Sequence, residues 1–462
     1  MAHRGQKDRT HPVKSFTTAK LSQAWYGAEG SDRPSTGRTF TINGSDRALQ
    51  DLVEALGYDF SRDRELASPY IASILSHWPG REPRMAYVDL LVQVIKLFSG
   101  TSGVGGGNTV SVQECIDHFI DSDHEYFKDG LPAGQVRTRT VTSSILIVLG
   151  SWTLMPRYFT PLPRGDQHRH IVSAYCKSRN INYDESIAFK LPLPRLMEES
   201  CLLPNPSESG PLVRPFIAPA SHEVQEFELH RMDEIESLSI DARDLNLYKL
   251  VALGGVRIKW TDDICRHLLL VNQGGLTYLE IFAIPCAIHG GAEYVLEKGG
   301  IPAELVQDIK ASYANLFNPV RLSRIHRIMK PILAMGYWCW CLSCSSRRLK
   351  TREFRKLQAN HIDSSSPRNR ASTPPYDPLL SILAEAKAVP WDPTEFPNLW
   401  PRLLSLHEHM NRSRPWNFWV LFRDNRDTLQ YWTFLFGTLI LILTILQVFL
   451  SIAQVVGSFK GD

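Results

Sequence analysis

The feature that most constrains this chain is an uncharged apolar stretch of 26 residues from Tyr431 to Val456. As an α-helix it would be about 39 Å long, because each residue adds about 1.5 Å. The hydrocarbon core of a bilayer is about 30 Å thick and takes about 20 apolar residues, so the stretch can span it with some tilt. A buried core helix is the alternative, but it fits poorly with this length and with a position six residues from the end of the sequence. We therefore predict a single transmembrane helix at 431–456.

Basic residues on the two sides of this stretch predict its orientation. Arg412, Arg414, Arg423 and Arg426 precede it, whereas only Lys460 follows it. Lys and Arg close to a span stay on the cytosolic side of the membrane. The first residues of the sequence contain no apolar run typical of a secretory signal peptide. We therefore expect a tail-anchored protein with a cytosolic N-terminal body, in a membrane that the sequence does not name.

Aromatic residues near the start of the span give a second indication. Their amphipathic rings are typical of the membrane interface, where they lie at headgroup level. We expect membrane contact there from Trp416, Trp419, Tyr431 and Trp432. The side of the span that carries both the aromatic and the basic residues is thus expected to face the cytosol.

Small and polar residues within the span follow a helical spacing, and we call them the polar stripe. They are separated by 7, 3, 4 and 3 positions, and they are Gly437, Thr444, Gln447, Ser451 and Gln454. In lipid, small and hydrogen-bonding residues form the contacts between helices. We therefore predict a homo-oligomer that forms through the stripe. Scattered polar residues that the membrane tolerates are the alternative.

The rest of the chain has the composition of a folded body, since 43% of the 462 residues are hydrophobic. We predict an α+β fold that is predominantly α-helical, with a helical N-terminal module and a small antiparallel β-meander. The expected segments are a disordered basic arm at 1–44, a helical module at 45–200, a Pro-rich linker at 201–222, an α+β module at 223–318, a basic, Trp/Cys-rich membrane-proximal segment at 319–357, a Ser/Pro linker at 358–378 and a helical stalk at 379–427.

Apolar residues three and four positions apart predict the helices of the N-terminal module. Leu52, Val53 and Leu56 belong to one such pattern, in a helix that begins at Ser45 or Asp46. Further helices are expected at 69–78, 85–98, 112–127 and 136–154. The apolar run SSILIVLGSWTLM at the end of the last helix is too short to span a membrane, so we expect it in the core.

A change to period two predicts the β-meander at 246–285. We expect strands at 247–253, 256–260, 267–271 and 277–284. The pairs Gly254-Gly255 and Gly274-Gly275 are typical of two-residue hairpin turns, so neighbouring strands should be antiparallel.

The segment from Arg321 to Lys356 carries ten Lys or Arg and one acid, Glu353, so its charge is +9. Its apolar centre contains Trp338 and Trp340, and we predict that it lies on an anionic membrane surface. Further expected membrane contacts are Arg347, Arg348, Lys350 and Arg352, and candidate lipidation sites are Cys339, Cys341 and Cys344.

Other interpretations of this basic segment are less favoured. Its cysteines are too close together for an ordinary zinc site. A nucleic-acid partner is not expected, because the aromatic residues are not interleaved with the basic ones. Buried aromatic residues beneath a solvated basic face remain the alternative to membrane contact.

Candidate catalytic chemistry is sparse. Asp262 and Asp263 follow an expected strand and could bind a cation or act as a general acid, but a turn whose carboxylates cap local backbone is favoured. The Gly-rich loop at 100–109 lacks the Lys of a phosphate-binding loop. His407 and His409 are two residues apart and do not share a helix face. The sequence therefore predicts no catalytic residue, no metal and no cofactor.

Five stretches carry a resemblance to a protein family. They are DLVEALGYDFSRDRELASPYIASIL (51–75), VALGGVRIKWTDDICRHLLL (251–270), SYANLFNP (312–319), WCWCLSCSSRRL (338–349) and FWVLFRDNRDTLQYWTFLFG (418–437). In them the chain resembles a family of filamentous-fungal proteins that have a C-terminal membrane segment and no assigned function. The resemblance covers most of 46–458, implies a single-pass membrane protein and brings no catalytic residues.

These observations predict a cytosolic interaction or scaffold body on a tail anchor, with the bilayer as one partner and a protein partner that the sequence does not name. A membrane-anchored enzyme is one alternative and would need Asp262 and Asp263 to line a deep pocket. A membrane-perturbing effector is another and would need residues 331–345 to insert into lipid.

Overall fold

In the computed structural model, the described residues are 46–78, 85–100, 110–122, 124–127, 135–160, 168–205, 239–318, 342–363, 374–413 and 428–459. All of them belong to one compact unit, Gly44–Asp462, which includes both expected modules. The expected arm at 1–44 and most of the linker at 201–222 lie outside the described residues.

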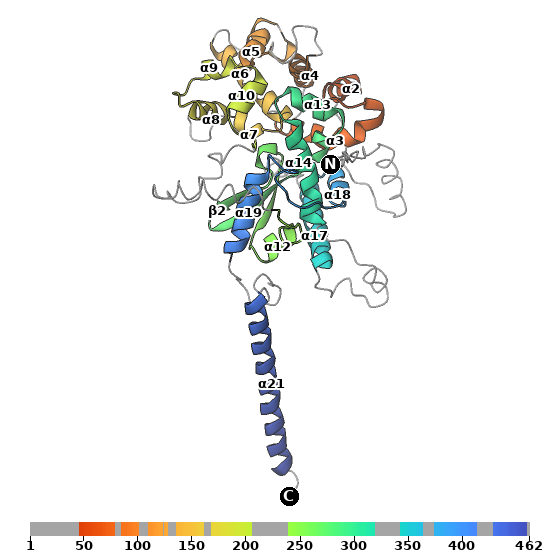
Figure 1. Ribbon diagram of the computed structural model, residues 1–462. Helices are drawn as coiled ribbons and strands as arrows, with labels where there is room; N and C mark the ends of the chain where they lie inside the picture. Colours follow the sequence, from red (N-terminus) through yellow and green to blue (C-terminus); the bar gives the residue numbers. More distant parts are fainter. Residues whose placement is uncertain are drawn as a thin grey trace, which may run out of the picture. The chain divides into compact units, whose positions relative to one another are not determined.

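The described part of the first half is helical (Figure 1). Its elements are α2 (Asp46–Ala55), α3 (Phe60–Ser76), α4 (Met85–Ser99), α5 (Val112–Asp121), η1 (Glu125–Phe127), α6 (Gln135–Trp152), α7 (Pro156–Phe159), α8 (His170–Ser178), α9 (Glu185–Phe189) and α10 (Leu193–Glu199). The second half adds α12 (Leu247–Ala252), β1 (Arg257–Thr261), η2 (Ile264–Arg266), β2 (Leu269–Gln273), β3 (Leu276–Phe282), η3 (Pro285–Ile288), α13 (Gly291–Lys298), α14 (Ala303–Phe317), α17 (Leu342–Asp363), α18 (Leu379–Leu383), α19 (Trp400–Arg412) and α21 (Thr428–Phe459). The prediction of a predominantly α-helical α+β fold is confirmed.

Local capping explains where two of the early helices begin and end. α3 begins at Phe60 because the Asp59 carboxylate accepts a hydrogen bond from Ser61 N. The sequence placed this start at Pro69, which instead lies buried inside the helix. α5 begins with a reciprocal capping box between Ser111 and Glu114 and ends at Asp121, so the helix expected at 112–127 is shorter than predicted.

The sheet is mixed and has the strand order β1-β3-β2. β2 and β3 form the expected antiparallel hairpin, whose turn residues Gly274 and Gly275 both have positive φ angles. β1 pairs with β3 in parallel, with Arg257 opposite Tyr278. The antiparallel meander is therefore correct for β2 and β3 and wrong for β1, because η2 carries the chain away from β1 before β2 begins.

The strand expected at 247–253 is the helix α12. The Asn246 side chain accepts a hydrogen bond from Lys249 N and caps its first turn. Leu247 and Leu250, three residues apart, are both buried, which is a helical pattern over a short length. Gly255, at a φ of 65°, then redirects the chain into β1 rather than closing a hairpin.

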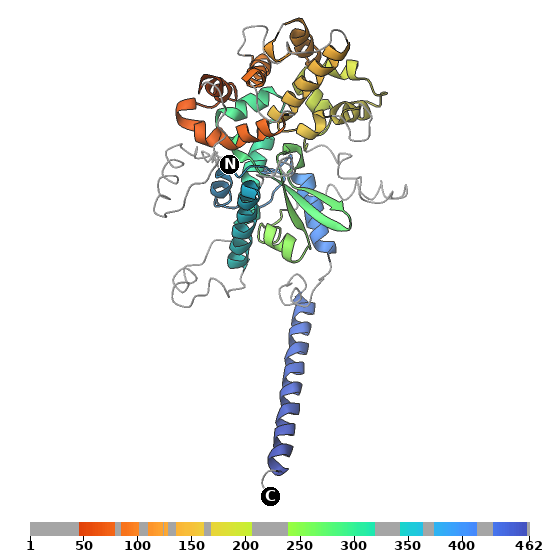
Figure 2. The same ribbon diagram turned by 180° about the vertical axis from the view of Figure 1, so that it is seen from behind.

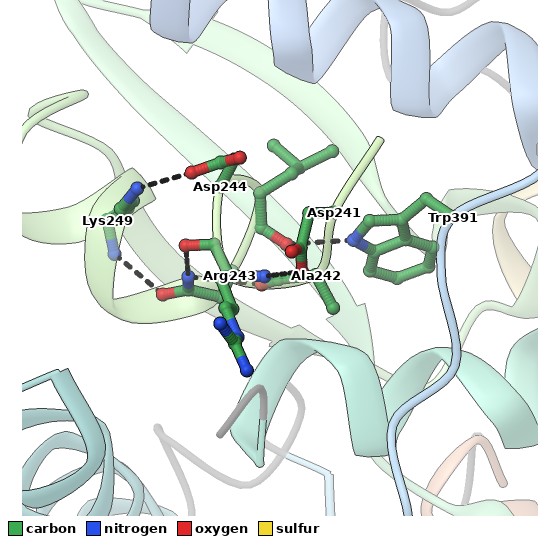
Figure 3. A network of polar contacts seen from close by, with 8 residues as sticks. Asp241, Ala242, Arg243, Asp244, Lys249 and Trp391 are labelled. Atoms are coloured by element: carbon green, nitrogen blue, oxygen red, sulfur yellow. Dashed lines mark hydrogen bonds and ion pairs between the residues drawn. The ribbon is translucent and has the colours of Figure 1, made fainter. Parts of the chain in front are cut away.

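The expected stalk at 379–427 is part of the body as far as it is described. Leu380 of α18 and Leu403 of α19 are fully buried. Before α19, Trp391 forms a backbone bridge with Ile240, and its indole Nε1 donates to the Leu245 carbonyl at 2.8 Å. Figure 3 shows this indole beside the loop of Asp241–Asp244 that leads into α12.

A set of contacts, which we call the seam, joins the first half of the body to the second. The Tyr58 hydroxyl donates to the Cys286 carbonyl at 2.6 Å, and Ile264 N donates to the Leu154 carbonyl at 2.9 Å. A Cβ on Gly291 would overlap the Gly57 carbonyl, so both backbones need glycine there. In Figures 1 and 2, α13 lies among α2, α3 and α4 accordingly.

Candidate functional site

α21 is a helix long and apolar enough to cross a membrane. Its most apolar part, Leu435–Val455, spans 21 residues, and none of that window is buried in the described structure. Ile440 is 64% exposed and Phe449 is 66% exposed. The helix contains no Asp, Glu, Lys, Arg or His, so its exposed surface carries no charge on any side. The expected span at 431–456 lies wholly within this helix.

The polar stripe lies along α21, and part of its hydrogen-bonding capacity is used inside the helix. The Thr444 hydroxyl donates to the Ile440 carbonyl and the Ser451 hydroxyl donates to the Gln447 carbonyl, each at 2.9 Å. Among the groups of the stripe, the glutamine side-chain amides can donate and accept several hydrogen bonds, which suits them to contacts with another helix. A Cβ on Gly437 would meet no atom within 4 Å, so this glycine leaves room for close approach.

Two expected interface residues belong to the first turns of α21. Trp432 is exposed, and its ring stacks on that of Phe436 with centroids 5.8 Å apart. Tyr431 lies in the same turn of the helix. Trp416 and Trp419 lie outside the described residues.

The basic segment ends in α17, which extends past the predicted boundary at 357 to Asp363. Leu349, Phe354 and Leu357 form its buried face. The Phe354 ring lies 6.0 Å from that of Trp260 and 5.2 Å from that of Phe317, so the helix is held against β1 and α14.

The outer face of α17 is basic. Residues four apart place its exposed and half-buried side chains in two adjacent rows, Arg347–Thr351–Arg355 and Arg348–Arg352–Lys356. Arg352 and Lys356 pair with Glu353, at 3.0 and 2.9 Å. Lys350, beside these rows, pairs with Glu385 at 3.1 Å. Like charges four residues apart destabilise a helix, so the row Arg348–Arg352–Lys356 lowers the local stability of α17.

The basic residues of α17 differ in how far their charge is compensated. Arg348 donates to the Ser345 hydroxyl at 3.2 Å. Arg347 and Arg355 form no ion pair with any residue in the described ranges. Cys344, in the first turn, is half-buried. Trp338, Trp340, Cys339 and Cys341 lie outside the described residues.

The turn of Asp262 and Asp263 caps local backbone, as the sequence favoured. One Asp263 carboxylate oxygen, Oδ1, accepts from Cys265 N at 3.1 Å and begins η2. The other oxygen, Oδ2, is buried and has no hydrogen-bond partner among the described residues. Complete burial, and then the nearby charge of Asp262, raise the pKa of Asp263 to about 7.

His77 is the residue at this turn that sequence reasoning missed. Its ring lies at the end of α3, with Nδ1 2.9 Å from the Ser73 carbonyl and Nε2 3.1 Å from the Asp262 carboxylate. Burial lowers the pKa of His77, but the hydrogen bond and charge of Asp262 outweigh it, so that the pKa is raised overall. No local spacing could reveal a pair so far apart in the sequence.

A second histidine, His267, has its pKa shifted in the direction opposite to that of His77. His267 is fully buried, its Nδ1 accepts from Phe282 N, and its Nε2 donates to the Ser312 hydroxyl at 2.8 Å. Burial and then the charge of Arg402 lower the pKa of His267 to about 3. It is therefore a neutral structural group.

The described residues contain no cluster of three or more His, Cys, Asp or Glu that could hold a metal ion. His409 bonds the Gly254 carbonyl at 2.9 Å, which explains it without a ligand. The Gly-rich loop lies almost wholly outside the described ranges.

Two further acids are buried in the body, and both accept hydrogen bonds from backbone amides. The Asp377 carboxylate accepts from Cys286 N and Leu379 N, and burial raises its pKa to about 6. Asp308 accepts from Asn398 N and Leu399 N, and burial raises its pKa to about 6 as well. Both acids fasten loops to the body through backbone amides.

No protein-family model, curated protein or solved structure matches this chain.

Proposed function

We propose that the protein is a single-pass membrane protein in which α21 anchors a cytosolic interaction body. The observation that carries this proposal is the uncovered apolar surface of α21 over Leu435–Val455. Transfer of one Leu, Ile or Phe side chain out of water contributes about 1.5–3 kcal/mol, so lipid cover for the whole helix is worth on the order of tens of kcal/mol.

The proposed orientation rests on charge. Arg412, at the end of α19, is followed by three more arginines before the helix, and only Lys460 comes after it. Such an asymmetry favours a cytosolic body. A tail-anchored arrangement, with the body on the N-terminal side of the span, is part of the same proposal.

Asn411 offers a test of the orientation. It is exposed in the last turn of α19 and begins the sequence Asn411-Arg412-Ser413, an acceptor for N-glycosylation. With the body in the cytosol this site never meets the glycosylation machinery, so the protein should run at the same mass before and after glycosidase treatment. A glycosidase-sensitive mass that the Asn411→Gln variant lacks would reverse the orientation.

The outer face of α17 is the proposed surface for anionic lipid headgroups. Arg347 and Arg355 have no acid beside them in the described structure, and each basic residue near an anionic membrane contributes about 1 kcal/mol. The buried side of α17 is held by Phe354, so the basic side can meet a surface without unfolding the helix. Cys344 and the expected Trp and Cys residues before it belong to the same proposed contact.

This contact can be tested on the full chain in lipid nanodiscs. Amide hydrogens of 342–363 should exchange more slowly in discs with anionic lipid than in neutral discs, and added salt should remove the difference. A variant with Gln at Arg347, Arg348, Lys350 and Arg352 should lose it, whereas Gln at the exposed Arg62, Arg64, Lys177 and Lys190 should keep it. Equal exchange in both kinds of disc at low salt would reject the lipid contact and leave the anchor proposal intact.

Self-association through the polar stripe is the third part of the proposal. The stripe combines a glycine that permits close approach with two glutamines, which are costly when they face acyl chains alone. In a pair of α21 helices, the glutamine amides would contact the facing helix. The body would then be presented in two or more copies at the membrane surface.

A membrane-anchored enzyme is the second candidate, and Asp263 is the observation in its favour. A carboxyl with a pKa of about 7 has the property required of a general acid at neutral pH. Its side chain is completely buried, however, so a substrate would reach it only if the seam opened. The effector alternative, which needs 331–345 to insert into lipid, is opposed by the burial of Ser345 in α17.

A further inference from the structure

The geometry of His77 defines its protonation state. The Ser73 carbonyl accepts hydrogen bonds and cannot donate, so Nδ1 must carry a proton to bond it at 2.9 Å. The Asp262 carboxylate is likewise an acceptor, so Nε2 must carry a second proton to bond it at 3.1 Å. Both bonds exist together only when the ring is the charged imidazolium. Loss of one proton therefore breaks one of the two bonds.

One of these two bonds, from His77 to Asp262, crosses the seam, whereas the bond to Ser73 lies within the first half. Ser73 and His77 belong to α3 and its cap in the first half, whereas Asp262 follows β1 in the second half. The other seam contacts, from Tyr58 to Cys286 and from Ile264 to Leu154, use backbone carbonyls and a hydroxyl. Those contacts do not depend on a proton that leaves near neutral pH. The link from His77 to Asp262 does.

Asp263 lies beside this link and adds a second titrating group. Its Oδ2 is buried without a partner among the described residues, so ionisation leaves a charge that no hydrogen bond compensates at that atom. Charged and titratable groups face it from every neighbouring element: Asp262 from the same turn, Cys265 and Arg266 from η2, Arg157 and Tyr158 from α7, and Arg402 from α19. Arg266 is engaged with Glu280, and Arg402 donates to the His267 carbonyl, so both arginines are committed elsewhere.

We propose that His77, Asp262 and Asp263 form a proton-operated latch that closes the seam at mildly acidic pH and loosens it as the pH rises. The closed latch holds two protons, one on the His77 ring in its hydrogen bond to Asp262 and one on Asp263. Deprotonation of His77 removes a donor from the seam. Deprotonation of Asp263 leaves an uncompensated carboxylate within it.

The signs of the three titrations agree with this direction. The raised pKa of His77 gives stability that is complete below 6.5 and is lost as pH rises through its folded value. The raised pKa of Asp263 gives stability that is complete below 3.8 and is lost as pH rises to about 7. The lowered pKa of Asp262 gives stability that is lost only as pH falls below 3.8. Above about pH 4, rising pH therefore only loosens the latch.

The most direct test is a pH titration of the full chain in lipid nanodiscs, with ¹³C-labelled histidine observed by NMR. The resonance that is lost in His77→Gln identifies His77. We expect this ring to titrate above 6.5 in the wild type and at a lower pH in Asp262→Asn. A wild-type value at or below 6.5, or no change in Asp262→Asn, would overturn the latch.

A second measurement reports whether the seam opens. Amide exchange of residues 261–266 and of the last turn of α3, corrected for the intrinsic effect of pH on exchange, should be several-fold faster at pH 8 than at pH 6. In Asp263→Asn, whose amide resembles the protonated carboxyl, the increase should be smaller. Equal corrected rates at the two pH values in the wild type would reject the proposal even if His77 titrates as expected.

Discussion

α6 ends in an apolar run and α21 is apolar along most of its length, and the two helices differ in what covers their apolar side chains. In α6, Ile145, Leu146 and Leu149 are fully buried, and Trp152 ends the helix with no exposed surface. In α21, apolar side chains of the same kinds are about half to two-thirds exposed around the whole helix. Apolar side chains of the same kinds are thus covered by protein in α6 and left uncovered in α21.

The difference shows which property of an apolar run predicts its environment. The run in α6 is followed by Leu154, whose left-handed conformation turns the chain back onto the body. The run in α21 continues without a charge or a turn for the length of a bilayer. The length of the uninterrupted apolar run therefore distinguishes the two helices, and paired substitutions can test the distinction.

The largest effect is expected from the same charge placed in each helix. Leu146→Arg buries an unpaired charge in the core, and we expect the body to unfold. Leu443→Arg should cost about 2.5–3.5 kcal/mol of membrane insertion and leave the body folded. Near-UV circular dichroism reports the first effect and membrane fractionation the second. Unfolding of the body by Leu443→Arg would show that α21 is a core helix.

A cavity gives the next largest contrast. Leu149→Ala in α6 should lower the free energy of unfolding by about 2–5 kcal/mol, because the side chain is fully buried. Leu450→Ala in α21 should leave the unfolding transition of the body unchanged. Chemical denaturation of the full chain in detergent micelles measures both. An equal shift of the unfolding transition in the two variants would contradict the difference in burial between α6 and α21.

The pH response should separate the two regions as well. α21 contains no Asp, Glu, His, Lys or Arg, so its membrane partitioning should be the same at pH 5 and pH 8. In the body, the raised pKa values of Asp263, Asp308 and Asp377 make stability fall as pH rises from about 4 to 7. The lowered pKa of His267 acts in the opposite sense below 6.5.

Asp263→Asn isolates one part of this pH response. Removing a buried charge should raise the thermal midpoint of the body at pH 8 more than at pH 5, since about 1.4 kcal/mol accompanies each pKa unit. Asp392→Asn is the control, because Asp392 is a surface cap in a turn. A larger gain at pH 5 than at pH 8 would contradict the assigned pKa direction.

Particular residues show how far the sequence could predict this structure. The Gly274-Gly275 hairpin, the apolar pattern of α2 and the length of α21 are local signals, and all three elements were predicted. The helix α12 was not, because its signal is a single cap by Asn246 on a run that is also compatible with a strand. The pairing of β1 with β3 and the contact of His77 with Asp262 depend on chain reversals that no local pattern contains. The capping role of Asp263 was predicted, but its burial was not.

The smallest expected effect concerns the polar stripe. Interhelical hydrogen bonds in membranes average about 0.6 kcal/mol, so Gln447→Leu with Gln454→Leu should weaken self-association modestly and leave insertion intact. Energy transfer between labelled chains in vesicles measures the association. Ile442→Leu with Ile445→Leu changes the opposite face of α21 and should have little effect. An undiminished signal from the double Leu variant would reduce α21 to a plain tether.

Alkaline carbonate extraction of membranes from cells that express the full chain tests most directly whether lipid covers the apolar surface of α21, as protein covers that of α6. We expect the full chain to stay in the membrane pellet and to be released by detergent, and a variant lacking 428–459 to appear in the supernatant. A full chain that carbonate releases into the supernatant would contradict the membrane anchor.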